Sequence, residues 1–413
     1  MSPAEKYYAF LDAVSPMNLI MTAELGRCFP IDQVGEHWTS FVSLRSTPRI
    51  RVQADLTLSD GGTSDLDFKG LELPSSEWNE QLGIESREPF GLDRPMRCRY
   101  LSSPDEGRSR LVFIGHHSVF DGRAGIVDLQ AFVRGLDGQA VPAQPLGSLP
   151  SPAQRQFPWQ ADREQLFALM RSIAARNEAA GPPEPSDWRQ PTIARAPRFF
   201  SVNVPDADAD ALLAGARTHQ TRAYAAIAAS WLVAVAARLC ESDTPTLHLA
   251  TPVDVGVPSA DVERPPSPAV SVVGNRYRVD PKSPWELALE VRTKLEASMN
   301  AGEGELFFQL SRANSIQDLE VGARVVAQAL ATAPPVVSVT NLGIIDPGSD
   351  PDWLLAMVGY LAPAPNQIAF VSGVGYRGRL VQSATTDDSQ LPAGAASAMV
   401  QEYGAVVRAM GAS

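Results

Sequence analysis

The sequence predicts an α+β protein in which strands and helices alternate within two halves of similar kind. The chain has 413 residues, more than one ordinary core needs and enough for two domains of about 200 residues each. Strand-like alternation and helix-like apolar spacing follow one another along both halves. A proline-rich stretch between Val141 and Pro197, which contains one helix-like segment, separates the halves.

In the first half we expect a helix over 31–45, a strand over 49–58, a hairpin of strands 96–103 and 110–117, and a helix over 123–136. Both helices are predicted from apolar side chains that recur on one face. These side chains are Val34, Trp38, Phe41 and Val42 in the first helix, and Ile126, Leu129, Phe132 and Val133 in the second.

The proline-rich stretch contains a predicted helix over 161–180, and the second half repeats the same kinds of element. We expect strands over 199–204, 245–255, 269–279, 335–343, 353–361, 368–376 and 378–386. Helices are expected over 205–219, 221–239, 284–299 and 316–331, and from about residue 391. We therefore divide the chain into domains 1–180 and 181–413.

The composition indicates a globular protein of the cytoplasm. Apolar residues make up 44% of the chain and charged residues 20%. No run of about 18 uncharged apolar residues is long enough to span a bilayer. The N-terminus lacks the basic-then-apolar order of a secretory signal. We expect a cytoplasmic monomer without a membrane span.

Charge and cysteine usage exclude two further classes. A net charge of −12 disfavours a nucleic-acid binder, because phosphate contacts need a basic surface. Cys28, Cys98 and Cys240 are far apart and form no Cys-x-x-Cys or Cys/His spacing. We therefore expect buried free thiols, and neither a disulfide framework nor a metal site.

The stretch FIGHHSVFDGRAG (113–125) lies where a predicted strand ends and a predicted helix begins. It contains His116 and His117, followed by Asp121 and Gly122. A neutral imidazole near pH 7 can accept a proton from an alcohol or amine that attacks a carbonyl, and can return it to a leaving thiolate. An aspartate here can pair with an arginine, orient the ring or cap the loop, and a glycine permits a sharp turn.

Three other interpretations of this stretch are weaker. Adjacent strand residues point to opposite faces, so His116 and His117 do not easily share one metal ion. A nucleophilic Ser118 would need a Gly-x-Ser-x-Gly turn, and that turn is absent. Two histidines satisfied inside a core remain the plain structural alternative, but the full HHxxxDG pattern rarely arises by chance.

The segment HHSVFDG resembles the HHxxxDG signature of the chloramphenicol-acetyltransferase-like superfamily, which includes nonribosomal peptide condensation domains, plant BAHD acyltransferases and mycobacterial polyketide-associated acyltransferases. Weaker similarities to other segments of that superfamily occur in the expected order: TPRIR (47–51), EPFGLDRPMRCRYL (88–101), TPVDV (251–255) and VSVTNLG (337–343). Thr47 replaces a common histidine, and Val255 and Gly256 replace a common Leu-Arg pair. No DFGWG-type segment is present, which disfavours the plant branch.

The resemblance covers about residues 5–410 and implies a specific architecture. Members fold as two α/β two-layer sandwiches in a V-shaped pseudo-dimer, with a tunnel between the halves. By this resemblance His117 is the general base, while His116, Asp121 and Gly122 shape the loop. Asp121 is then expected to form a structural salt bridge, with Arg51 of TPRIR as its partner.

The tetrahedral oxyanion of acyl transfer needs hydrogen-bond donors. We expect these to be the backbone N–H of Gly122 and a side chain of VSVTNLG, from among Ser338, Thr340 and Asn341. The same side chains can equally serve as ordinary strand-end hydrogen-bonding groups. A tunnel that excludes water would suppress hydrolysis of the thioester, which is the competing reaction.

The sequence thus predicts a stand-alone acyltransferase of bacterial natural-product or lipid biosynthesis. We expect no resident cofactor. The donor is a phosphopantetheine thioester on an acyl or peptidyl carrier protein or on coenzyme A, and the acceptor is a small-molecule hydroxyl or amine. Because carrier proteins are acidic, a local arginine patch is expected at the donor mouth. Its candidates, which also fit solvated strand edges, are Arg94, Arg97, Arg99, Arg108 and Arg110.

Two alternatives to acyl transfer are retained. The first is a non-catalytic condensation-like domain that recruits a partner enzyme, which the intact HHxxxDG motif disfavours. The second is an enzyme that uses the same tunnel and base for cyclisation or dehydration, which the motif does not exclude.

Overall fold

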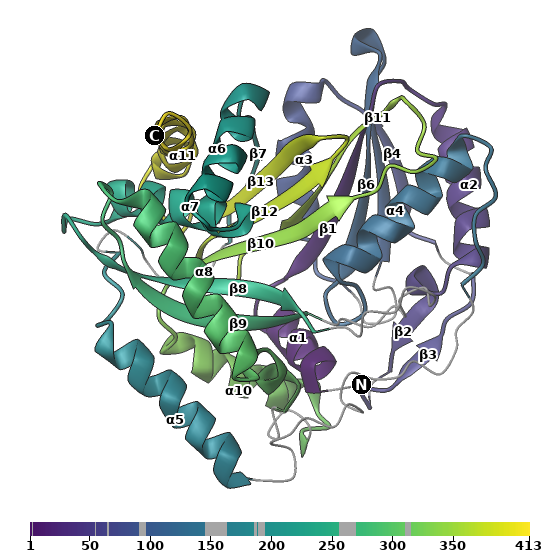
Figure 1. Ribbon diagram of the computed structural model, residues 1–413. Helices are drawn as coiled ribbons and strands as arrows, with labels where there is room; N and C mark the ends of the chain where they lie inside the picture. The colour runs from purple at the N-terminus through teal and green to yellow at the C-terminus, as the bar shows by residue number, and fades with distance from the viewer. Residues whose placement is uncertain are drawn as a thin grey trace.

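The computed structural model describes residues 1, 3–53, 55–63, 66–90, 96–144, 163–185, 188, 195–255, 270–309 and 315–413. Two main sheets lie side by side with helices packed around them (Figure 1). This arrangement confirms the expected α+β class. Much of the proline-rich stretch (145–162, 186–187 and 189–194), together with Arg94 and Gly256, lies outside the described residues.

The first sheet has five strands in the order β11-β1-β6-β5-β4. Their bounds are Asn18–Leu25 (β1), Phe68–Glu72 (β4), Met96–Ser103 (β5), Arg108–His116 (β6) and Leu354–Leu361 (β11). Neighbours are antiparallel except β4 and β5, which are parallel. β5 and β6 form the expected hairpin.

The second sheet has six strands in the order β7-β13-β12-β10-β8-β9. Their bounds are Pro197–Val202 (β7), Thr246–Asp254 (β8), Val270–Arg278 (β9), Val336–Ile345 (β10), Gln367–Tyr376 (β12) and Arg379–Asp387 (β13). β10 runs parallel to both β8 and β12, and the other pairs are antiparallel.

The helices cover both sheets. They are α1 (Pro3–Val14), α2 (Ile31–Leu44), α3 (Trp78–Glu85), α4 (Gly122–Leu136), α5 (Arg163–Ala179), α6 (Asp206–Thr218), α7 (Ala223–Leu239), α8 (Pro284–Asn300), α10 (Leu319–Ala331) and α11 (Ala395–Gly411), with a 3₁₀ segment η5 (Glu303–Gln309). The apolar faces expected of α2 and α4 are buried, and they pack with β6 into one aromatic core.

Two elements cross the expected division between residues 180 and 181. β11 comes from the C-terminal part of the chain but pairs with β1 in the first sheet, from Leu19 opposite Leu361 to Leu25 opposite Leu354. α5 precedes the division, yet Arg276 of β9 donates to the carbonyl oxygen of its Asn177 at 3.0 Å. The division therefore stays a prediction about folding units, while in space the two halves exchange segments.

The segment 49–58 is not the single strand that we expected. β2 (Ile50–Val52) and β3 (Leu58–Asp60) form a two-stranded hairpin of their own. The turn is closed by the N–H of Gln53, which donates to the carbonyl of Thr57 at 2.8 Å. Leu56 in this turn has φ +60°, a left-handed conformation that breaks the extended chain.

The helices and the cysteines can be compared with the expectations for membrane spans and thiols. Among the described residues no single helix is long and apolar enough to cross a membrane. All three cysteines are free thiols; Cys98 is buried, whereas Cys28 and Cys240 are half-buried.

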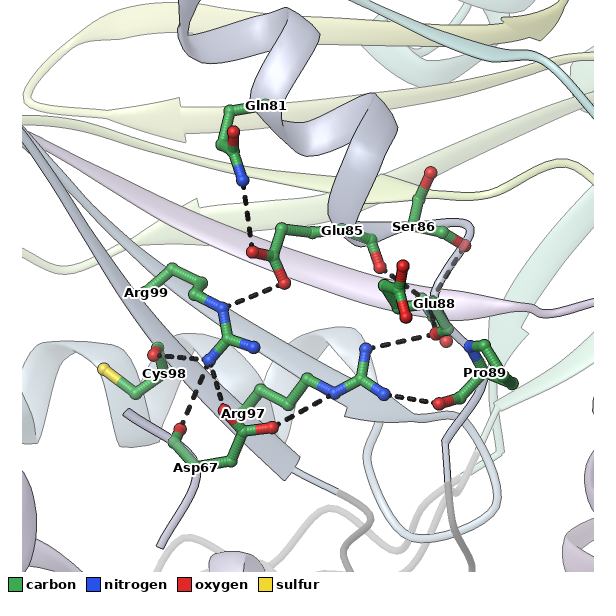
Figure 2. A network of polar contacts seen from close by, with 10 residues as sticks. Asp67, Gln81, Glu85, Ser86, Glu88, Pro89, Arg97, Cys98 and Arg99 are labelled. Atoms are coloured by element: carbon green, nitrogen blue, oxygen red, sulfur yellow. Dashed lines mark hydrogen bonds and ion pairs between the residues drawn. The ribbon is translucent and has the colours of Figure 1, made fainter. Parts of the chain in front are cut away.

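The arginines of β5 belong to a buried ion-pair network (Figure 2). Arg99 lies 2.6 Å from a carboxylate oxygen of Asp67 and 2.9 Å from one of Glu85. Arg97 lies 3.4 Å from the same Asp67 and donates to the carbonyl of Glu88 at 3.1 Å. The network ties the end of α3 to β5, next to the edge of the first sheet.

This network corrects the expected arginine patch. The side chains of Arg97 and Arg99 are at most 10% exposed. Arg110 is also buried, against Glu24 at 2.5 Å. These three side chains are neither a docking patch nor solvated strand edges, because each is engaged inside the fold. Only Arg108, of the described candidates, has a side chain that is substantially exposed.

Replacing Arg99 by methionine should lower the free energy of unfolding by about 2–3 kcal/mol, because Asp67 and Glu85 would keep partly buried charges without a full complement of partners. Urea unfolding followed by tryptophan fluorescence measures this loss. The control is Arg108→Met, whose side chain is 46% exposed and which should change stability by less than about 0.5 kcal/mol. Equal losses in the two variants would contradict a structural role for the network.

Candidate active site

The histidine motif forms the connection between β6 and α4. His116 is the last residue of β6, residues 117–121 form a turn, and Gly122 begins α4. The side chain of Asp121 accepts a hydrogen bond from the N–H of Ala124 at 2.8 Å and so caps the helix. The predicted strand-to-helix connection is thus confirmed.

The His117 ring is held from two sides. Its Nδ1 lies 3.1 Å from the carbonyl oxygen of Phe120. The ring of Tyr8 in α1 stacks on it, with centroids 4.1 Å apart and planes 14° apart. A carbonyl only accepts hydrogen bonds, so the neutral ring carries its proton on Nδ1 and has its basic lone pair on Nε2.

Burial keeps His117 neutral. Desolvation lowers the pKa of His117 to about 4, and the nearby Asp121 carboxylate opposes this shift without cancelling it. At pH 7 the imidazole is therefore a proton acceptor and not a cation. Its neutral state suits a general base, because the lone pair is free before substrate arrives.

His116 has a different environment. Its Nδ1 accepts hydrogen bonds from the backbone N–H of Ser118 at 3.1 Å and from the Ser118 hydroxyl at 2.7 Å. Its Nε2 lies 3.4 Å from a carboxylate oxygen of Asp12 in α1. Asp12 also accepts from the N–H of Met17 at 2.8 Å. His116 therefore fastens α1 to the loop, which agrees with the supporting role expected for it.

The salt bridge expected between Asp121 and Arg51 remains a prediction. Arg51 donates to the carbonyls of Pro48 and Ile50 at 3.1 and 3.0 Å, and its guanidinium lies against Gly61. Arg51 belongs to β2, and the separate β2–β3 hairpin turns its side chain toward its own strands. Asp121 acts as the cap of α4, the simpler role considered from sequence.

A cavity of about 330 Å³ lies between the two halves at His117. From the first half it is lined by Tyr8, His117, Asp121 and Gly122, and from β10 of the second half by Ser338, Thr340 and Asn341. The structure thus brings together six of the eight residues expected in the site. The other two, His116 and Arg51, are not among the lining residues.

The three polar residues of β10 differ in their surroundings. Ser338 is buried and Thr340 half-buried, and their alternation along the strand places both on the cavity side. The Asn341 side-chain carbonyl accepts from the N–H of Gly343 at 2.9 Å, which is the local strand-end role considered from sequence. Thr340 and Ser338 are therefore better placed than Asn341 to donate to a substrate oxygen.

Gly122 permits the halves to approach closely. A Cβ at this position would lie 2.8 Å from a methyl carbon of Leu342 in β10. As the first residue of α4, Gly122 also has a backbone N–H without an acceptor inside the helix. A hydrogen-bond donor thus faces the cavity at the point where the two halves meet.

Sequence reasoning missed four residues of the site. Tyr8 stacks on the base, and its helix was not predicted. Arg123 reaches across the cavity rim to Asp254 of β8, with Nη1 and Oδ2 2.9 Å apart. His248 of β8 lines the cavity together with Asp254. The period-two spacing of 248, 250, 252 and 254 was the available signal, since alternate strand residues face one side.

Comparison with solved structures gives the fold of the chain. The trichothecene 15-O-acetyltransferase TRI3 from Fusarium sporotrichioides matches with a TM-score of 0.72 and 10% identity, over 99% of this chain and 94% of that one. The condensation domain of the Monacolin K polyketide synthase MokA matches with a TM-score of 0.65 and 13% identity, over 100% and 97%. The cyclization-docking bidomain of EpoB from Sorangium cellulosum matches with a TM-score of 0.66 and 15% identity, over 96% and 80%.

The chain has the fold shared by these condensation, cyclization and acetyltransferase structures. The comparison with protein-family models gives no match, nor does the comparison with curated proteins. The expected pair of sandwich-like halves is confirmed at the level of fold. At these identities the condensation-domain fold leaves the reaction open.

The pKa of His117 can be measured directly by following histidine NMR signals against pH. The signal that disappears in His117→Gln should titrate with a midpoint at about 4 in the folded protein. In urea the same signal should move to about 6.5, the ordinary value for an exposed histidine. The unfolded chain then binds the extra proton between these values, so this group lowers stability as pH falls from about 6.5 to about 4. A folded midpoint near about 6.5 would contradict the burial argument.

Removing the Asp121 cap should cost about 1 kcal/mol of stability in Asp121→Ala. The matched control is Asp318→Ala, since Asp318 caps α10 through the same bond to Val321 at 2.8 Å. Only Asp121→Ala should also lower the pKa of His117 further, because it removes the opposing charge. Equal effects of Asp121→Ala and Asp318→Ala on that pKa would contradict the influence of the Asp121 charge on His117.

Proposed function

We propose that this protein is an acyltransferase that moves an acyl or aminoacyl group from a phosphopantetheine thioester to a hydroxyl or amine. The observation that supports this most directly is the state of His117. It is a neutral imidazole, fixed in the Nδ1–H tautomer, at the wall of a cavity between two halves. The acetyltransferase and condensation domains that share the fold support the same class of reaction.

In the proposed reaction Nε2 of His117 removes the proton from the acceptor hydroxyl or amine as that atom attacks the thioester carbonyl carbon. The carbonyl oxygen becomes an oxyanion. When the tetrahedral intermediate collapses, the carbon–sulfur bond breaks, and the leaving thiolate takes the proton back from His117 as a free thiol. One acyl group moves and His117 returns to its neutral state.

The surrounding groups each have a part in this step. The oxyanion would accept hydrogen bonds from the Gly122 N–H and from Thr340 or Ser338, which line the same cavity. Tyr8 and the Phe120 carbonyl keep the imidazole from turning, so Nε2 keeps its direction. Holding both reactants against this fixed base recovers much of the entropy cost of a bimolecular reaction.

The proposed donor is a coenzyme A ester or a loaded carrier protein, and no resident cofactor is required. Three of the expected arginine contacts are engaged inside the first half, so we place no carrier-protein patch on β5. The proposal includes a cytoplasmic setting, in which coenzyme A esters are available.

A donor screen with acyl-coenzyme A esters and loaded carrier proteins, against alcohols and amines, tests the proposal. Wild-type protein should form an ester or amide with at least one pair of substrates. His117→Ala should lose at least about 100-fold in kcat/KM, because a positioned general base contributes about 10²–10⁴. His219→Ala is the matched histidine control and should retain activity, since His219 stacks on Trp285 away from the cavity.

Mass spectrometry of the products separates acyl transfer from cyclisation or dehydration. Acyl transfer joins the acyl group to the acceptor and releases a thiol, whereas cyclisation by condensation and dehydration also release water. Full activity in His117→Ala, or a wild type that transfers no acyl group from any donor, would refute the proposal.

A further inference from the structure

A second cavity adjoins the site and is not used in the proposed reaction. It has a volume of about 300 Å³ and lies among α5, η5 and the edge strand β9. His248, Val272 and Gly274 line both this side cavity and the catalytic cavity at His117. A substrate chain can therefore extend from His117 past His248 into the side cavity.

His248 has an unusual environment for a histidine. Both of its ring nitrogens are buried and lack a hydrogen-bond partner. Burial, with the nearby Arg276 guanidinium, lowers the pKa of His248 to about 4, so the ring is neutral near pH 7. A neutral imidazole donates through one nitrogen and accepts through the other, and leaving both unused costs stability.

A second residue of the side cavity also has an unused polar group. Asn177 of α5 lines the side cavity, and its Oδ1 is also buried without a hydrogen-bond partner. Buried polar groups in proteins are nearly always hydrogen-bonded, so two such groups at one cavity indicate a partner that binds there. The remaining walls are largely apolar, with Ile173, Val273 and Leu306 among them.

A glycine on the neighbouring strand leaves room for the imidazole. Gly274 of β9 pairs with Ala250 and so lies diagonal to His248, and a Cβ there would come within 2.7 Å of Nε2. Glycine thus leaves space that any other residue would fill. The torsion about the Cβ–Cγ bond of histidine is broad, so a small rotation brings a ring nitrogen to a ligand at low cost.

The charges of this region favour a neutral ligand group. The carboxylate of Glu303, which lines the side cavity, is already paired with Arg176 through two bonds of 2.6 and 2.8 Å. The positive charge of Arg276 next to His248 disfavours an ammonium group. A hydroxyl satisfies both unused groups, because it can donate to Asn177 and accept from or donate to His248.

We infer that His248 and Asn177 bind a hydroxyl group on a substrate chain that extends from the catalytic cavity into the side cavity. This inference rests on the proposed function for the identity of the chain, which is either the acyl chain of the donor or the chain of the acceptor. His248 is thus a specificity residue, and it takes no part in the proton transfer at His117.

The test measures binding and does not depend on turnover. The donor arm compares S-octyl-coenzyme A with thioethers that carry a hydroxyl on carbon 4, 6 or 8 of the chain. The acceptor arm compares 1-octanol with octanediols that have the second hydroxyl at the same positions. Calorimetry gives each Kd, and NMR of the five histidines reports which ring is contacted.

In one arm, a hydroxylated probe should bind wild-type protein about tenfold more tightly than its plain counterpart and shift the His248 signal. His248→Phe should bind the hydroxylated and plain probes with equal affinity, and His248→Gln should retain part of the preference. Gly274→Ala should weaken the preference without altering the imidazole itself, which covers the case in which His248→Phe does not fold. His219→Phe is the control and should behave as wild type.

The arm that responds identifies the source of the chain. The inference is overturned if neither arm shows a preference for a hydroxylated probe, or if the preference survives in His248→Phe. A hydroxyl preference in a protein that transfers no acyl group would support the side cavity and refute the proposed function. Acyl transfer by a protein that shows no preference for a hydroxylated probe would support the proposed function and refute the role of the side cavity.

Discussion

The pairing of β11 with β1 is the constraint on which the site depends. β10 belongs to the second sheet, but the next strand, β11, joins the first sheet. The chain therefore connects the two halves at this point. This connection holds Leu342 against Gly122 and sets Ser338 and Thr340 across the cavity from His117. Neither half forms this arrangement alone, because the base comes from one half and the candidate side-chain donors, Ser338 and Thr340, come from the other.

The two adjacent histidines at the end of β6 have different roles: His116 makes structural contacts, and His117 lies at the cavity. Successive side chains on a strand point to opposite faces, so His116 and His117 enter different surroundings. His116 uses its hydrogen-bonding capacity on Ser118 and lies beside Asp12, which fixes the first helix. That helix then supplies Tyr8, which stacks on His117. The supporting histidine therefore acts on the base indirectly, through the position of α1.

Sequence patterns predicted most of the helices and strands but missed α1, α3, β1 and β4. α2 and α4 were recognised because one face is buried and the other solvated. β1 was missed because it lies between β11 and β6 and is buried on both faces, so its residues do not alternate. The HHxxxDG motif located the loop, because its residues are contiguous. The Asp121–Arg51 pairing stays a prediction, because no local pattern encodes where a distant hairpin turns its side chains.

The electrostatics of the cavity favour neutral reactants over charged ones. Asp121 lies at the N-terminus of α4, where its side chain accepts from the Ala124 N–H and the helix dipole favours an acidic group. Arg123 and Asp254 neutralise one another at the rim. His117 and His248 are both kept neutral by burial. An imidazolium would therefore be costly before the reaction and tolerable only beside the developing oxyanion, so proton transfer and nucleophilic attack are best coupled in a single step. A base that ionises only as the opposite charge forms next to it favours the transition state over either separated ion.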